Sequence, residues 1–144
     1  MVQDRRARVP QRAMSQELAE RVAKAAQDKA AELGITMSVA VVDESGNMVY
    51  FVRGDTSSFI TFESARGKAI MAAGFRRPTH EMMDGVRNNV AFWSSMAEKL
   101  KMQPGGGGHP LTLDGVIIGG VGCGGGIGDQ DEVCSEAGAE AVNT

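Results

Sequence analysis

Two glycine-rich segments in the second half of the chain constrain its fold most strongly. Residues 104–110 read PGGGGHP and residues 119–126 read GGVGCGGG, so together they hold ten of the nineteen glycines. Glycine adopts positive φ without strain and lets the backbone approach a ligand closely, but it gives up side-chain packing. We therefore predict that the two segments face each other as the walls of a pocket that accepts an anion.

The composition indicates a single globular domain. The chain has 144 residues, of which 42% are apolar and 23% charged, and a chain of this length buries about two-thirds of the surface that its unfolded form exposes. No apolar run approaches the roughly 18 residues of a membrane helix, so we expect no membrane partner. The net charge of −3 argues against nucleic acid as a partner, because phosphate binding needs a broad basic surface.

The start of the chain carries a local excess of positive charge. Its first twelve positions hold four arginines and one aspartate: Arg5, Arg6, Arg8, Arg12 and Asp4. No apolar segment follows these arginines, which argues against a secretory signal. We expect residues 1–14 to form a flexible basic extension, residues 15–144 to form the domain, and the protein to be cytoplasmic.

Hydrophobic periodicity and turn residues predict the order of the elements. Helices are predicted at residues 15–33, 59–73, 79–87 and 88–101, and from residue 129 onward. Strands are predicted at residues 37–42, 48–52, 111–113 and 116–121. Ser15, Thr79 and Asp129 are suited to be N-caps, and Gly34 and Gly74 are suited to end helices. Hairpin-joined strands with helices before, between and after them indicate an α+β domain built on one antiparallel sheet.

Residues 124–126 lie between a predicted strand and a predicted helix, where consecutive backbone N–H groups can converge on an anion. Gly124 and Gly125 are therefore candidate ligand-binding residues, together with Gly107 and Gly108 of the other segment. No Lys-Ser/Thr pair follows, so a nucleotide loop is disfavoured. The alternative is a bulged turn that serves packing alone.

His109 and Cys123 are the candidate catalytic residues. Free backbone amides and a helix N-terminus near Cys123 would stabilise its thiolate and make it a nucleophile. The alternative is that Cys123 is a small apolar residue that packs at a strand end. His109 can act as an acid or base, or as the axial ligand of haem; partners spaced for zinc are missing. Cys134 is predicted to be a core residue, and both cysteines are predicted to be free thiols. His80 is expected to be neutral and structural.

Arg53 and Lys68 are the cations that we expect to hold an anionic ligand. Arg53 ends a predicted strand, and Lys68 interrupts the apolar side of a predicted helix, where its charge must reach water or find a partner. Asp131 is a third candidate ligand-binding residue. Equally, Arg53 and Lys68 can be solvated, or paired with Asp55 and Asp131.

Several short motifs together resemble the GlcG/HbpS-like family, also called the haem-degrading-protein or DUF336 family, which includes the C-terminal domain of PduO-type proteins. The resemblance runs from about residue 15 to residue 142, and its motifs are MSVAVVD with Gly46, Arg53, ARGKA, Pro78, GGHP, DGVIIG, GCGG and QDE. The family commonly has serine where this chain has Cys123, and a small apolar residue where it has His109.

The resemblance implies a profilin-like α+β fold with a five-stranded antiparallel sheet, and assembly into dimers or larger rings. Some relatives bind haem, and others are linked to corrinoid or diol metabolism. The first hypothesis is therefore a binding protein for haem or a related tetrapyrrole, with His109 or His80 on the iron and arginine or lysine on the propionates. The second is an enzyme that acts on a small carboxylate or hydroxy acid by acid/base chemistry, of the isomerase or lyase type. The third is an accessory oligomer with a vestigial pocket.

Overall fold

A computed structural model describes residues 12–127 and 129–144. Its strands are β1 (Ser38–Asp43), β2 (Met48–Val52), β3 (Gly108–Leu113) and β4 (Val116–Gly124). Its α-helices are α1 (Gln16–Glu32), α2 (Thr61–Phe75), α3 (Met83–Asn88), α4 (Val90–Leu100) and α5 (Gln130–Glu140). Two 3₁₀ helices complete the order, η2 (Thr79–Met82) and η3 (Ala141–Asn143). The predicted α+β class is confirmed.

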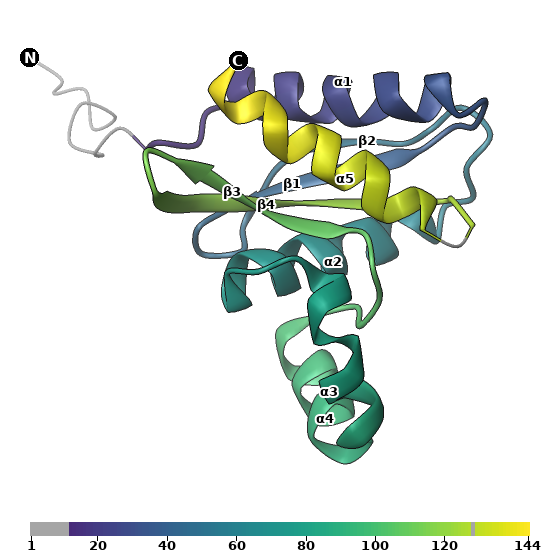
Figure 1. Cartoon of the computed structure of the whole chain (residues 1–144), viewed down its shortest axis with the longest axis vertical. Coiled ribbons are helices and arrows are strands. Elements are labelled where there is room, and N and C mark those ends of the chain that lie inside the picture. Colours follow the sequence, from purple (N-terminus) through teal and green to yellow (C-terminus); the bar gives the residue numbers. More distant parts are fainter. Residues whose placement is uncertain (1–11, 128) are drawn as a thin grey trace, which may run out of the picture.

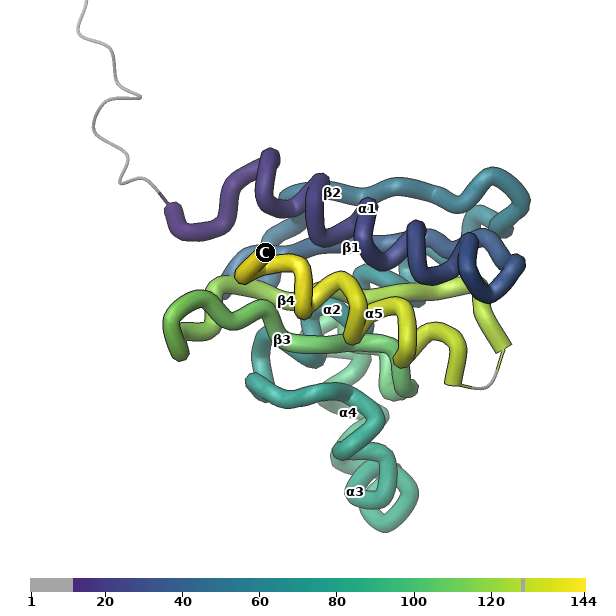
Figure 2. The backbone as a smooth tube through the Cα atoms, turned by 45° about the horizontal axis from the view of Figure 1, so that its top comes forward, coloured from purple at the N-terminus to yellow at the C-terminus, as the bar shows by residue number. Residues whose placement is uncertain are grey.

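The strands form one antiparallel sheet in the order β2-β1-β4-β3. Helices α1 and α5 cover one face of the sheet and α2 covers the other, while α3 and α4 project away from the body as an arm (Figure 1). The tube in Figure 2 shows α1 and α5 lying side by side in front of the sheet. Because the central strand β1 has a helix layer on each side, all six of its residues are buried.

The expectation of five strands is wrong, because the described residues form a four-stranded sheet. The long segment between α2 and β3 contributes no strand. Its apolar residues recur at helical rather than alternating spacing, and it forms η2, α3 and α4. β3 is therefore an edge strand of this sheet, and its one proline, Pro110, is tolerated there.

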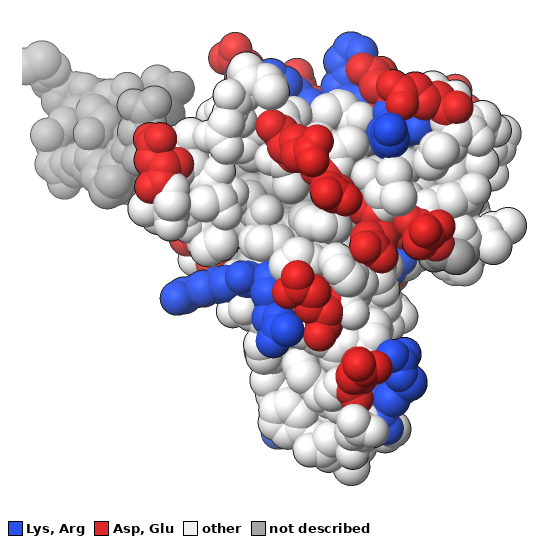
Figure 3. Space-filling model, in the orientation of Figure 1, with Lys and Arg blue, Asp and Glu red and all other residues white. Residues whose placement is uncertain are grey.

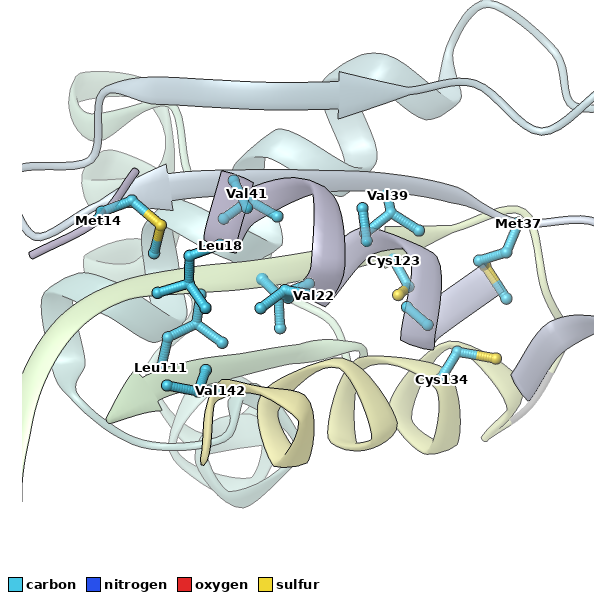
Figure 4. Packing of buried hydrophobic residues seen from close by; sticks show 14 of the residues in the cluster. Met14, Leu18, Val22, Met37, Val39, Val41, Leu111, Cys123, Cys134 and Val142 are labelled. Atoms are coloured by element: carbon cyan, nitrogen blue, oxygen red, sulfur yellow. The ribbon is translucent and has the colours of Figure 1, made fainter. Parts of the chain in front are cut away.

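The main core lies between the sheet and the α1–α5 layer. Figure 4 shows Val22 and Leu18 of α1 facing Val39 and Val41 of β1. Met14 joins this cluster and is only 5% exposed, so the packed domain includes a residue that we assigned to the extension. The rest of that prediction concerns residues 1–11, which lie outside the described part of the chain.

Four glycines of the second segment, Gly119, Gly120, Gly122 and Gly124, are residues of strand β4, and Gly125 and Gly126 follow the strand. Gly120, Gly122 and Gly124 alternate along β4 with Val121 and Cys123, so the glycines face α2 while the larger residues face the main core. A Cβ added at Gly122 would lie 2.0 Å from the carbonyl oxygen of α2 residue Ala65. The sheet thus meets α2 through backbone and small side chains.

Several local predictions are confirmed and several are corrected. The Ser15 hydroxyl accepts the Leu18 amide and caps α1, and Gly34 adopts φ +75°. Helix α2 continues past Gly74 to Phe75, and its C-cap Arg76 adopts φ 60°. Asp129 makes no side-chain cap bond in the structure.

Thr79 is likewise not a helix cap. Its hydroxyl is buried and accepts the Gly108 amide at 3.0 Å. This bond ties the start of β3 to η2 and so fixes the first glycine segment against the root of the arm. In the described part of the chain, no helix is long and apolar enough to cross a membrane.

Candidate functional site

His109 is held in one tautomer by a buried hydrogen-bond chain. Its Nδ1 lies 2.7 Å from the hydroxyl oxygen of Ser135 on α5. That hydroxyl also lies 3.0 Å from the carbonyl oxygen of Glu132, which can only accept, so we assign the hydroxyl proton to this carbonyl and the imidazole proton to His109 Nδ1. The other nitrogen, Nε2, therefore keeps its lone pair.

Burial also favours the neutral form of this imidazole. His109 is 8% exposed, and burial lowers its pKa below 6.5, while nearby Glu136 acts in the opposite direction. A neutral imidazole with a free Nε2 is the form that ligates a metal or accepts a proton. The structure thus equips His109 for either role that the sequence suggested.

His80 lies beside His109 rather than being buried in the core. The two ring centroids are 6.0 Å apart with planes inclined at 42°, which brings together η2 and the edge strand β3. His80 Nδ1 is 3.3 Å from Glu132 Oε1, and the His80 side chain is 39% exposed. The pair therefore forms an accessible site with one buried and one exposed imidazole.

Glycines next to this pair fall into two groups. A Cβ at Gly107 would lie 2.6 Å from Asp131 Cβ, and one at Gly108 would lie 2.4 Å from the Lys68 carbonyl oxygen, so packing demands both glycines. A Cβ at Gly106 would lie 3.6 Å from His80 Cβ, and one at Gly105 would meet the Lys68 side chain at 3.6 Å, both ordinary contacts. The fold tolerates a side chain at Gly105 and Gly106, and its absence at Gly106 leaves bare backbone beside His80.

Lys68 and Asp131 form a buried ion pair behind the glycine segment. Lys68 Nζ donates to Asp131 Oδ2 at 2.8 Å and to the Cys123 carbonyl oxygen at 3.0 Å. The second oxygen, Asp131 Oδ1, accepts the Gly126 amide at 2.8 Å. The structure therefore realises the alternative in which Lys68 is paired with Asp131.

The same carboxylate fills the predicted anion nest. Gly124 is paired within β4 opposite Ser38, Gly125 adopts φ +115° to leave the strand, and the Gly126 amide is taken by Asp131. The chain's own aspartate thus occupies the position that we had assigned to an external anion.

Cys123 does not have the setting of a nucleophile. It lies inside β4, is fully buried in the main core, and burial raises its pKa well above the ordinary value. The predicted activation by free amides fails because the neighbouring glycines are paired strand residues. Cys134 is also buried in this cluster, as predicted, and both thiols are free.

Arg53 lies away from the histidines. It is exposed at the end of β2, beside a small hollow of about 300 Å³ lined also by Gln27, Thr36 and Asp55. The structure does not bring it together with Lys68. Among the described residues, no three His, Cys, Asp or Glu side chains are placed to hold a metal ion.

Sequence reasoning missed Ser135 and misassigned Thr79, the two hydroxyls that fix the site. Neither carries a signal in the sequence, because each acts across elements that are far apart in the chain. Only the bond from Ser135 to Glu132 follows a local helical spacing.

Comparison with known proteins gives consistent matches. The family described as "Haem degrading protein HbpS-like" matches residues 14–140. An uncharacterized 15.0 kDa protein of the dhaT-dhaS intergenic region of Citrobacter freundii is 31% identical over 82% of this chain and 84% of its own length. The corrinoid adenosyltransferase PduO of Salmonella typhimurium is 31% identical, but the chain spans only 36% of its length.

Solved structures show the same fold. The crystal structure of HbpS has a TM-score of 0.79 and 32% identity, covering 96% of this chain and 97% of that chain. A crystal structure of a PduOC–haem complex has a TM-score of 0.80 and 30% identity, covering 91% of this chain and 96% of that chain.

Proposed function

Since this chain belongs to the HbpS-like family of haem degrading proteins, we propose that it binds haem or a related tetrapyrrole, with His109 as the axial ligand. The observation that carries the proposal is the fixed tautomer of His109, whose Nδ1 proton is held by Ser135. A second-shell hydrogen bond of this kind orients an imidazole and leaves Nε2 to the metal. One similar structure is a complex with haem.

The residue types around His109 support a haem-like ligand. Gly106 places bare backbone beside His80, where an added Cβ would lie 3.6 Å from the His80 Cβ, and His80 is available as a second nitrogen ligand. Arg76 is exposed just before η2, where it can pair with a propionate, while the neighbouring Arg77 is paired with Glu81 at 3.6 Å. Bound haem would supply a redox-active iron, while this chain orients the ligand and keeps its nitrogen unprotonated.

The proposal is tested by titrating haem into the protein and following absorbance in the Soret region. We expect a saturable change that is lost or strongly weakened in His109→Ala. Ser135→Ala should weaken binding without abolishing it, because only the orientation of the imidazole is lost. Arg53→Ala, which changes a distant exposed residue, is the matched control. Absence of saturation, or unchanged binding in both His109→Ala and His80→Ala, would refute the proposed ligation.

The second candidate function, an acid/base enzyme for a small carboxylate, rests on the same nitrogen. A neutral His109 with a lowered pKa and a free Nε2 is a suitable general base. Proton exchange at the α-carbon of lactate in D2O, followed by NMR, tests this candidate. Exchange that is abolished by His109→Gln would favour it, and exchange that is absent or unaffected would remove it.

We also propose that the protein assembles through its arm. Helices α3 and α4 contain no buried residue, and α4 exposes three large apolar side chains: Val90, Phe92 and Leu100. A helical pair that buries so little is stabilised when it packs on a second copy. Size-exclusion chromatography with light scattering should show a dimer or larger species, and Phe92→Asp should dissociate it. The expected cytoplasmic location stays a prediction.

A further inference from the structure

The hollow beside Arg53, here called the Arg53 hollow, lies where the end of α1 meets the end of β2 and shares no lining residue with the His80–His109 pair. Its volume of about 300 Å³ is at the lower end of the range for small-molecule sites. It is lined by an apolar group, Ile35, Met37 and Val52, and by a polar group, Gln27, Arg53 and Asp55. Apolar and charged walls therefore meet in one small space.

The Arg53 hollow holds one cation and one anion, and the protein pairs neither of them. Arg53 and Asp55 are the charged residues that line it, and both are exposed. Within the part of the chain that the structure describes, neither side chain takes part in an ion pair, so the pairing of Arg53 with Asp55 that the sequence allowed is not formed. Both charges are therefore open to a ligand from solvent.

The backbone between the two charges is anchored to the core. Gly54 is buried, and its amide donates to the Ser38 hydroxyl at 3.1 Å. A Cβ at Gly54 would lie 2.9 Å from the Met37 amide nitrogen, so the backbone is packed tightly at this point. A site on anchored backbone loses less conformational freedom when a ligand binds. Arg53 and Asp55 thus extend from a fixed segment.

Gln27 adds a neutral acceptor to the same hollow. Its Nε2 donates to the Met37 carbonyl oxygen at 3.0 Å, which orients the amide and leaves Oε1 as an acceptor. An ammonium group has three N–H donors and can use both this oxygen and a carboxylate. A guanidinium is in turn a strong donor to a carboxylate.

We propose that the Arg53 hollow binds a small apolar α-amino acid as the zwitterion. Arg53 donates to its carboxylate, and Asp55 and Gln27 accept from its ammonium group. The apolar wall at Met37 and Val52 takes its side chain. A simple carboxylate would leave Asp55 without a partner, and a simple amine would leave Arg53 without one. The site is independent of the haem proposal, because it uses neither histidine.

Three related compounds test the need for both charges. L-leucine carries both, N-acetyl-L-leucine lacks the ammonium group, and L-leucinamide lacks the carboxylate. Isothermal titration calorimetry of the haem-free protein gives the three affinities. The backbone amide signal of Gly54 in NMR reports whether binding occurs at this hollow, because Gly54 lies between the two charged residues.

Three variants and two controls separate the charges from the cavity. Arg53→Gln removes the cation, and Asp55→Asn removes the anion. Ala31→Trp fills the hollow from an exposed position of α1. Arg87→Gln and Asp84→Asn are the matched controls, because they change an exposed arginine and aspartate on the arm. Circular dichroism establishes that each variant is folded.

We expect leucine to bind saturably and about tenfold tighter than either analogue. Arg53→Gln should weaken leucine binding about tenfold without changing that of leucinamide, and Asp55→Asn should do the same without changing that of N-acetyl-leucine. Ala31→Trp should abolish binding, and both controls should bind as the wild type does. Equal binding of the three compounds, undiminished affinity in Arg53→Gln or Asp55→Asn, or absence of saturation would overturn the proposal. Leucine binding should also persist in His109→Ala, so this test and the haem titration can fail independently.

Discussion

The alternating glycines of β4 should be required for the fold, and Gly122→Ala tests this most severely. The new Cβ would lie 2.0 Å from the Ala65 carbonyl oxygen and 2.6 Å from the Ala69 amide nitrogen, whereas an ordinary contact needs at least 3.4 Å. The sheet and α2 must therefore separate locally by at least about 1.4 Å. Both contacts are backbone atoms, which no rotamer change can move.

The expected cost can be bounded. Overpacking of a core costs about 1–3 kcal/mol when side chains can adjust, and here only backbone can yield, so we expect a loss of about 3 kcal/mol or more in the free energy of unfolding. Domains of this size have about 5–15 kcal/mol in total, so urea unfolding followed by circular dichroism will resolve the change.

Gly74→Ala is the matched control. Gly74 lies in α2, and a Cβ there meets nothing within 4 Å. The same chemical change should therefore raise stability by about 0.5–1 kcal/mol through helix propensity. A loss below about 1 kcal/mol for Gly122→Ala would refute the packing argument and return these glycines to the role of a ligand loop.

Three further predictions concern buried groups. Burial lowers the pKa of His109, so protonation of this imidazole opposes folding, and the free energy of unfolding should fall as the pH decreases below 6.5, by at most about 1.4 kcal/mol per pH unit. His109→Gln should lack this dependence, and the difference in slope between the two proteins should vanish above pH 7. Urea unfolding that gives the two proteins the same pH dependence would contradict this. Lys68→Met should lower the free energy of unfolding by about 3–5 kcal/mol, because it leaves the Asp131 carboxylate buried without a partner. The double variant Lys68→Met with Asp131→Leu should recover much of this loss, and additive losses for the two substitutions would disprove a coupled pair. Both cysteines are buried, and the pKa of Cys134 is raised to about 11, so a thiol reagent should label Cys123 and Cys134 only as fast as the protein unfolds. Rapid labelling of the native protein would be inconsistent with their burial.

The elements with local signals could be predicted from the sequence. Helix α1 has a strong apolar period and a cap at Ser15, and the hairpin of β1 and β2 has turn residues between two short apolar, β-branched runs. Local signals failed where tertiary packing decides. The strand predicted at residues 116–121 ends too early, because β4 continues through the glycines to Gly124. Glycine carries no strand signal, yet it is needed at Gly120 and Gly122 because the backbone of α2 leaves no room for a side chain.

The site was predictable only in part for the same reason. His109 stood out as a histidine among glycines, and Lys68 stood out as a charge on an apolar helix face, but their partners lie on elements distant in sequence. Conversely, the strand register that buries Cys123 is set by pairing with Val39, which no local pattern specifies. Figure 3 shows a stripe of acidic side chains across the region where α5 lies. The sequence of α5 holds Glu132 and Glu136 four residues apart, a spacing that places both on one side of a helix.

The central claim is that His109 Nε2 is the ligand of a bound haem iron, and pulsed EPR of the ferric complex tests it most directly. Protein labelled with ¹⁵N-histidine should show a coupling between the iron spin and an imidazole nitrogen. This coupling should disappear in His109→Ala and persist in Arg53→Ala. A bound haem whose imidazole coupling is the same in His109→Ala, or that shows none in the wild type, would contradict the account.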